Sequence, residues 1–272
     1  MTSSPGEVRL RGLGLHTGRP SEVRLTRCDG PVVFRTSLGE ATMDELRVVR
    51  CDHGVRVCCE RVGFDVDTVE HFLAALGGLS IRSEVAIEVD GPEMPLLDGG
   101  ALAFAKALAG LARGNEVPAL RVLRHAVIHV GASKYELTPG DEVVLDIEIG
   151  FDVPRIGRQT ASWRGSAEAF VGDIAWARTF GFRRDGDALR RSGRAGAVDP
   201  TAVMVLDDQG AVEPPGEEAR PGEFARHKLL DLVGDLYLFG GPPRGTLRAT
   251  RPGHAATHRA MTEALEQGIV GE

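Results

Sequence analysis

Residues 65–79 read DVDTVEHFLAALGGL, and this stretch predicts a helix with one buried face. Its large apolar side chains recur at the three- and four-residue spacing of a helix. They are Phe72, Leu73, Leu76 and Leu79. Asp67 or Thr68 can cap the first turn, because a short side-chain oxygen can accept a hydrogen bond from a free backbone amide there. We therefore expect a helix over residues 65–79.

Strands are expected on both sides of this helix. Before it, Val23 and Leu25 alternate with polar neighbours, and after it residues 85–89 alternate in the same way. A period of two residues is typical of a strand with one buried face. A loop with Gly91 and Pro92 then leads to a second predicted helix over about residues 101–111. The first part of the chain thus contains strands, a helix, a strand and a helix.

The rest of the chain repeats this order, although no sequence repeat is detectable. The expected elements are strands within residues 120–151, a strand near 203–206, a helix over 223–239, a strand over 245–250 and a helix over 254–267. We predict an α+β fold of two similar α+β halves, residues 1–116 and 117–272. Helices would pack between antiparallel sheets in a layered sandwich.

Composition limits the possible partners of the chain. Its 272 residues carry a formal net charge of −7, which disfavours bulk nucleic-acid binding. No apolar run approaches the roughly 18 residues of a membrane-spanning helix, and the N-terminus lacks the apolar core of a signal peptide. We expect a cytoplasmic protein with no nucleic-acid partner and no transmembrane segment.

The four cysteines lie close together at Cys28, Cys51, Cys58 and Cys59. With His53, three of them form the pattern C-x-H-x4-C-C, which superficially resembles a metal cluster. We prefer the interpretation that they are alternating strand residues in a reducing compartment, since adjacent cysteines make a poor disulfide framework.

The predicted helix over residues 223–239 carries a polar row. His227 and Asp231 are four residues apart, so both project from one face, and Asp235 continues the row by one more turn. Imidazole and carboxylate are common zinc ligands, and this spacing lets two of them reach one ion. Alone the pair is a weak signal, because most such pairs make only a surface interaction.

Glu70 and His71 strengthen the metal hypothesis. They are adjacent at the first turn of the matching helix, where an acid is also favoured by the helix dipole. One of two such residues can bind metal while the other handles protons. Three protein ligands would leave a fourth position for water, as in a catalytic zinc site. The site would lie between the two halves.

Other histidines have simpler interpretations. His125 and His129 lie in a strand-like stretch and are expected to be half-buried or on the surface. His258 follows His254 by one turn and is expected at a solvated helix position.

Seven blocks of sequence, in order from about residue 8 to 267, resemble those of the UDP-3-O-acyl-N-acetylglucosamine deacetylase family, which catalyses the committed step of lipid A synthesis. The blocks are GLGLHTG (12–18), TVEHFLAALGGL (68–79), GPEMPLLDG (91–99), IGRQ (156–159), ARTFGF (177–182), EFARHKLLDLVGD (223–235) and RPGH (251–254). Any one of these blocks could occur by chance, but seven in order point to the family.

The resemblance implies a metal centre. His71, His227 and Asp231 match the family's zinc ligands, and Glu70 matches its general base. The cofactor implied is Zn²⁺, although Fe²⁺ would suit the same ligand set.

The resemblance also implies the remaining catalytic and binding roles. His254 matches the general acid, Asp235 the carboxylate that orients it, and Thr179 the hydroxyl that stabilises the oxyanion. Lys228 and Phe180 are assigned to substrate binding. The implied substrate is a small nucleotide sugar that can carry an acyl chain, and we expect a monomer.

Three departures from the family pattern leave alternatives open. Residues 80–83 read Ser-Ile-Arg-Ser where the family has Gly-Ile-Asp-Asn, and the chain is short for the family. The segment 184–198 matches the region that forms an apolar tunnel for the acyl chain, but it carries Arg190, Arg191 and Arg194. This favours a weak preference for long acyl chains, because a tunnel needs apolar lining. The alternatives are a deacetylase for another N-acetyl sugar with a short acyl chain or none, or a catalytically silent metal-binding homologue.

Overall fold

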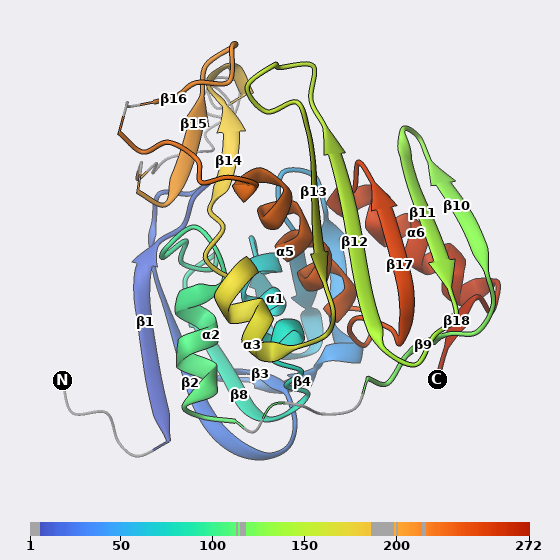
Figure 1. The fold of residues 1–272 in the computed structure, drawn as a ribbon. Coiled ribbons are helices and arrows are strands. Elements are labelled where there is room, and N and C mark those ends of the chain that lie inside the picture. Colours follow the sequence, from blue (N-terminus) through green and yellow to red (C-terminus); the bar gives the residue numbers. More distant parts are fainter. Residues whose placement is uncertain (1–5, 113, 115–117, 186–198, 200, 214–215) are drawn as a thin grey trace.

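Two five-stranded sheets form most of the strand structure of the chain (Figure 1). The computed structural model describes residues 6–112, 114, 118–185, 199, 201–213 and 216–272. The first sheet has the order β1-β2-β8-β3-β4, with β1 (Glu7–Leu13), β2 (Pro20–Pro31), β3 (Val33–Thr36), β4 (Gly39–Thr42) and β8 (Ser83–Asp90). Neighbouring strands are antiparallel except for the β3/β8 pair.

The second sheet has the order β10-β11-β17-β12-β13. Its strands are β10 (Ala126–Val130), β11 (Ser133–Thr138), β12 (Val143–Gly150), β13 (Arg158–Trp163) and β17 (Gly245–Thr250). Here β12 and β17 are the parallel pair, because the chain passes through a helix between them and returns in the same direction. The period-two pattern is confirmed, since Leu145, Ile147 and Ile149 are all buried.

Smaller sheets complete the strand structure. They are β5 (Arg47–Arg50) with β6 (Arg56–Cys59) and β7 (Phe64–Val66), β14 (Thr179–Phe182) with β15 (Val203–Leu206) and β16 (Val212–Glu213), and β9 (Arg121–Val122) with β18 (Val270–Gly271). All four cysteines lie within the described residues and are free thiols. Cys28, Cys58 and Cys59 are strand residues as expected, but Cys51 follows the end of β5, and Cys58 and Cys59 are both buried rather than alternating.

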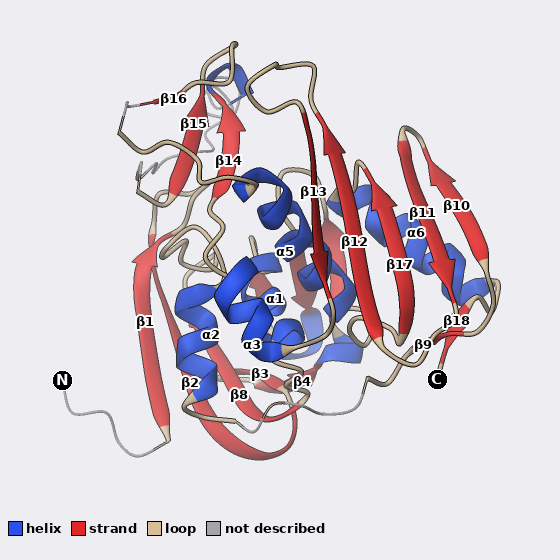
Figure 2. Cartoon of the chain, in the orientation of Figure 1, coloured by secondary structure: helices blue, strands red, loops and turns tan. Residues whose placement is uncertain are grey.

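The helices α1 (Glu70–Gly78), α2 (Leu102–Ala109) and α5 (Glu223–Tyr237) lie between the two large sheets (Figure 2). The last helix, α6 (His254–Glu266), packs against α5 and β10. Short turns add η1 (Met43–Glu45), η2 (Glu60–Val62) and α3 (Ala167–Ala169), which runs into the π-helical turn η3 (Phe170–Ile174). The α+β class with helices between sheets is therefore confirmed. The sheets are expected to be antiparallel, but each large sheet also contains one parallel pair, β3/β8 and β12/β17. Within the described residues, no helix is long and apolar enough to cross a membrane.

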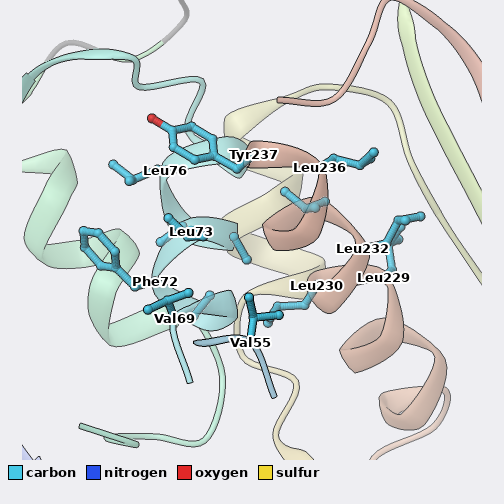
Figure 3. Packing of buried hydrophobic residues seen from close by; sticks show 14 of the residues in the cluster. Val55, Val69, Phe72, Leu73, Leu76, Leu229, Leu230, Leu232, Leu236 and Tyr237 are labelled. Atoms are coloured by element: carbon cyan, nitrogen blue, oxygen red, sulfur yellow. The ribbon is translucent and has the colours of Figure 1, made fainter. Parts of the chain in front are cut away.

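Close packing of α1 against α5 fixes where their polar side chains meet. Figure 3 shows buried apolar side chains of α1, among them Leu73, and of α5, among them Leu230, in one cluster. At the contact, a Cβ atom on Gly234 would lie 2.2 Å from the carbonyl oxygen of Glu70. Only glycine permits this approach, so Gly234 brings the first turn of α1 directly onto the middle of α5.

The start of α1 differs from the prediction. The helix begins at Glu70 rather than at residue 65, and its N-cap is Val69, with no side-chain cap hydrogen bond there. Neither Asp67 nor Thr68 has the predicted capping role. The reason is tertiary: residues 64–66 form β7, and Asp67 pairs with Glu93 in an isolated bridge. The other predicted helices and strands agree with the structure to within two residues at most ends.

Two predictions concern residues at or beside positions that lie outside the described residues. Arg190, Arg191 and Arg194 belong to residues 186–198, which lie outside the described residues. The boundary between residues 116 and 117 has undescribed residues beside it, and the division into two halves there stays a prediction.

Candidate metal centre

Three side chains that can bind a metal meet where α1 contacts α5. His71 comes from the first turn of α1, and His227 and Asp231 come from successive turns of α5. The Nε2 atoms of His71 and His227 lie 3.8 and 3.4 Å from Asp231 Oδ1. One ligand atom from each residue fits within a 4.8 Å group, and all three side chains are buried. The structure thus brings together the three predicted ligands.

The hydrogen bonds of this cluster use one polar atom each of Asp231 and His227 and leave the other atom directed toward the neighbouring ligand. Asp231 Oδ2 accepts a hydrogen bond from Lys228 Nζ at 2.8 Å, but the buried Oδ1 has no hydrogen-bond partner among the described residues. His227 Nδ1 donates to the carbonyl of Ala177 at 3.1 Å, which turns its Nε2 toward Asp231. An unsatisfied buried carboxylate oxygen is costly unless a cation lies beside it. The donor set therefore fits a bound metal ion.

The electrostatics of the cluster support the same conclusion. Burial, together with His227, lowers the pKa of His71 to about 3, and burial also lowers the pKa of His227. Burial alone would raise the pKa of Asp231, but the neighbouring His227, Lys228 and His254 together hold it well below its ordinary value. At neutral pH the imidazoles are then neutral and the carboxylate is ionised, the forms that bind a metal.

Glu70 is buried beside the cluster in a different environment. Its Oε2 accepts a hydrogen bond from the Val55 backbone amide at 2.9 Å. Burial raises the pKa of Glu70 to about 7, although the charge of His254 opposes this shift. A carboxyl whose pKa lies near neutrality is suited to accept and release a proton.

His254 and Asp235 form a hydrogen-bonded pair on the other side of Asp231. His254 Nδ1 donates to Asp235 Oδ1 at 2.8 Å, and its Nε2 lies 3.9 Å from Asp231 Oδ2. Burial alone would lower the pKa of His254, but Asp235 raises it to about 9. His254 is therefore protonated at neutral pH, with its Nε2–H on the side of the ligand cluster.

Lys228 and Phe180 border the cluster. Lys228 Nζ lies 5.7 Å from the centre of the Phe180 ring, and that ring lies 5.9 Å from the His227 ring. Thr179 precedes Phe180 on β14, and its backbone amide donates to the Gly99 carbonyl at 2.7 Å. Within the described part of the chain its hydroxyl makes no hydrogen bond, so it can donate to a ligand.

The interpretation of His258 as a solvated residue is wrong. Its side chain is buried, its ring packs 5.2 Å from the Phe239 ring, and its Nε2 lies 3.5 Å from Asp235 Oδ1. The reason is that His258 follows His254 by one helical turn and so faces the same carboxylate. The spacing used to pair His227 with Asp231 could have found it. His125 and His129 are exposed, as expected.

Comparisons with known proteins give one consistent match. A family model described as UDP-3-O-acyl N-acetylglycosamine deacetylase matches residues 4–266. A UDP-3-O-acyl-N-acetylglucosamine deacetylase of Myxococcus xanthus is 36% identical over 265 residues, covering 94% of this chain and 83% of the relative. Proteins of the same name from Geobacter sp. strain M21 and Brucella melitensis biotype 2 are 33% and 34% identical, and the alignments cover 96% and 95% of this chain and 87% and 92% of the relatives.

Proposed function

The chain belongs to the UDP-3-O-acyl N-acetylglycosamine deacetylase family, and on that premise we propose that it removes the N-acetyl group from a UDP-3-O-acyl-N-acetylglucosamine in lipid A biosynthesis. It acts as a metal-dependent amide hydrolase. The residues assigned to metal binding are His71, His227 and Asp231. The metal proposed is zinc, because two imidazoles and one carboxylate with an open fourth position are a typical catalytic zinc set.

One observation supports this proposal most strongly. Asp231 Oδ1 is buried and lacks a hydrogen-bond partner among the described residues, and it faces the Nε2 atoms of two histidines that are neutral at pH 7. A purely structural polar cluster would satisfy such an oxygen with a donor. A divalent cation would satisfy all three groups at once.

The chemistry divides between the two sides of the cluster. When bound, zinc would act as a Lewis acid toward the acetamide carbonyl and would lower the pKa of a neighbouring water. Glu70 accepts the proton of the water whose oxygen bonds to the carbonyl carbon. The hydroxyl of Thr179 donates to the oxygen that becomes negative as the carbonyl is attacked.

His254 completes the reaction as the general acid. The carbon–nitrogen bond breaks only if the nitrogen receives a proton, since an amide anion is a very poor leaving group. His254 Nε2–H supplies that proton, and Asp235 holds the ring through Nδ1 and keeps it protonated. The products are acetate and the free amine of the sugar.

The surroundings of the cluster suggest how substrate is held. Lys228 carries a positive charge beside Asp231, and Phe180 offers an aromatic face next to His227. We assign both to substrate contacts. The two halves, residues 1–116 and 117–272, are proposed to enclose the substrate, because His71 and Glu70 come from one and His227, Asp231 and His254 from the other.

The test is mass spectrometry of the product after incubating metal-replete protein with UDP-N-acetylglucosamine and with its 3-O-acyl derivatives. The proposal predicts loss of one acetyl group from the acylated substrate. Turnover of unacylated sugar alone would point to a related deacetylase with another substrate. No product from any of them, with metal bound, would indicate a silent metal-binding homologue. Metal analysis in the same samples distinguishes zinc from iron(II).

A further inference from the structure

A further buried carboxylate, Glu93, lies in the loop after β8 and has no role in the chemistry above. Its side chain is fully buried, and its hydrogen-bond partners are all donors. The backbone amide of His16 donates to both oxygens, at 3.0 and 3.2 Å. The amide and hydroxyl of Thr17 donate to Oε2, at 2.9 and 2.8 Å, and the Thr68 hydroxyl donates to Oε1 at 2.8 Å. Glu93 thus joins three segments that are distant in sequence.

The loop over residues 14–18 is built around this carboxylate. A Cβ atom on Gly14 would lie 2.3 Å from Glu93 Oε2, so only glycine allows the loop to close over Glu93. The amide of Gly18 donates to the Gly14 carbonyl at 2.9 Å and completes the turn. Gly14 therefore serves the Glu93 contact directly.

Two contacts of Glu93, those with Thr68 and His16, lead to Glu70 by short paths. Thr68 lies two residues before Glu70 and has a φ of +57°, which is strained for a β-branched residue. Such a conformation persists only where the surroundings determine it, and here the hydroxyl of Thr68 is fixed by Glu93. The contact between Glu93 and Thr68 therefore fixes the backbone conformation just before α1.

The second path from Glu93 to Glu70 passes through His16. The Nε2 of His16 donates to the His53 carbonyl at 2.8 Å. Two residues later, the amide of Val55 donates to Glu70 Oε2, and the carbonyl of Val55 accepts from Val69 at 3.1 Å. Figure 3 shows Val55 and Val69 side by side at the first turn of α1. The path from Glu93 through His16 therefore fixes the position of the Val55 amide, which donates to the Glu70 carboxylate.

The path through Thr68 and the path through His16 come together at Gly54. A Cβ atom there would lie 3.1 Å from Glu70 Oε1 and 3.6 Å from both His16 Nε2 and Thr68 Oγ1. These groups consequently line one side of the Glu70 carboxylate.

We propose that Glu93 is a positioning residue for the general base Glu70, an inference that rests on the proposed function. It acts through Thr68 and through His16, and it touches neither the metal ligands nor the site of bond cleavage. Glutamine cannot replace it, because an amide offers one acceptor oxygen where the carboxylate offers two. The His16 amide or the Thr17 amide would then face an NH₂ group.

The test is a double-mutant cycle with Glu70→Gln and Glu93→Gln, assayed on UDP-3-O-acyl-N-acetylglucosamine. Glu93→Gln is expected to lower kcat by roughly 10- to 100-fold, the usual cost of misplacing a reacting group, with little change in KM or in bound metal. In the Glu70→Gln background the second substitution should have almost no further effect, because the base through which it acts is gone. Glu88→Gln, on the outer face of β8 beside Arg24, is the matched control and should keep normal activity.

Three results would overturn the proposal. The first is a double variant whose loss of kcat is the product of the two single losses. The others are normal activity in Glu93→Gln and loss of metal from Glu93→Gln. Should Glu93→Gln fail to fold, the same cycle with Thr68→Val removes one contact alone and decides the question. Failure of the proposed function has a different signature, since the unmutated protein would then itself release no acetate from this substrate.

Discussion

Two carboxylates at the α1/α5 contact are equally buried but respond in opposite ways. Glu70 on α1 is 4% exposed and Asp231 on α5 is 5% exposed. Burial raises the pKa of Glu70 to about 7, whereas the pKa of Asp231 falls well below its ordinary value despite the same burial. The difference lies in their neighbours, because Asp231 contacts the Lys228 ammonium and lies close to three histidines, while the charge of His254 and the Val55 amide only partly offset the burial of Glu70.

The comparison teaches how one site can hold carboxylates with different tasks. Cationic neighbours keep Asp231 ionised, as a metal ligand must be. Their scarcity around Glu70 leaves a group that can take and release protons near neutral pH. The Lys228 ammonium beside Asp231, rather than a difference in the depth of burial, would thus separate the two proposed roles. The predictions below test this division.

The largest effect is expected from removing the metal. Dialysis of the protein against a chelator should abolish activity, by on the order of 10³-fold or more, because a cation supplies several kcal/mol to charge stabilisation in the transition state. Added Zn²⁺ should restore it. His227→Ala should not recover at the same zinc concentration, whereas His129→Ala, at an exposed position on β10, should. Full activity in metal-depleted protein would contradict the assignment of Asp231 as a metal ligand needed for catalysis.

Glu70→Gln should lower kcat by roughly 10²- to 10⁴-fold, the usual contribution of a positioned acid or base. The amide oxygen can still accept from the Val55 amide, so the fold should be kept. Steady-state rates and a thermal melt check both statements. A variant with a normal kcat would mean that another group accepts the proton.

Asp235→Asn should move the pH dependence of kcat. If the protonated form of His254 is the acid, as proposed, activity is present below its pKa and is lost as pH rises through that pKa, about 9. Without the Asp235 carboxylate, burial lowers this pKa, and the basic limb should shift to lower pH by roughly one unit or more. Rates measured from pH 6 to 10 show the shift. An unchanged basic limb would separate His254 from the general-acid step.

Gly234→Ala tests the contact that brings the two carboxylates together. The added Cβ would overlap the Glu70 carbonyl, and relieving this overlap is expected to cost about 1–3 kcal/mol of the free energy of unfolding, partly offset by the better helix propensity of alanine. The thermal midpoint should therefore fall by a few degrees. Gly172→Ala is the control, since a Cβ there meets nothing within 4 Å. Equal melting of both variants would show that α1 and α5 are not held by this close approach.

Local patterns in the sequence were sufficient for much of the fold and part of the site. The i, i+4 spacing of His227 and Asp231 and the alternation in β12 are encoded within a few residues, so both could be predicted. Assigning Glu70 as base and His71 as ligand needed the family resemblance, because both residue types can bind metal or move protons.

Other features depend on contacts between distant segments and could not be predicted in this way. The start of α1 is set by the bridge between Asp67 and Glu93, and not by a capping residue. The parallel pairing of β12 with β17 depends on where the chain returns after α5. The burial of Glu93 depends on donors from residues 16, 17 and 68, to which no short-range pattern points.

The division of roles between the two carboxylates is tested most directly by the metal content of Glu70→Gln and Asp231→Asn, measured by inductively coupled plasma mass spectrometry after purification in the same zinc-containing buffer. If Glu70 is a base and Asp231 a ligand, Glu70→Gln keeps one metal ion per chain and Asp231→Asn loses most of it. A variant Asp231→Asn that keeps its full metal content, or a Glu70→Gln that loses it, would contradict the account.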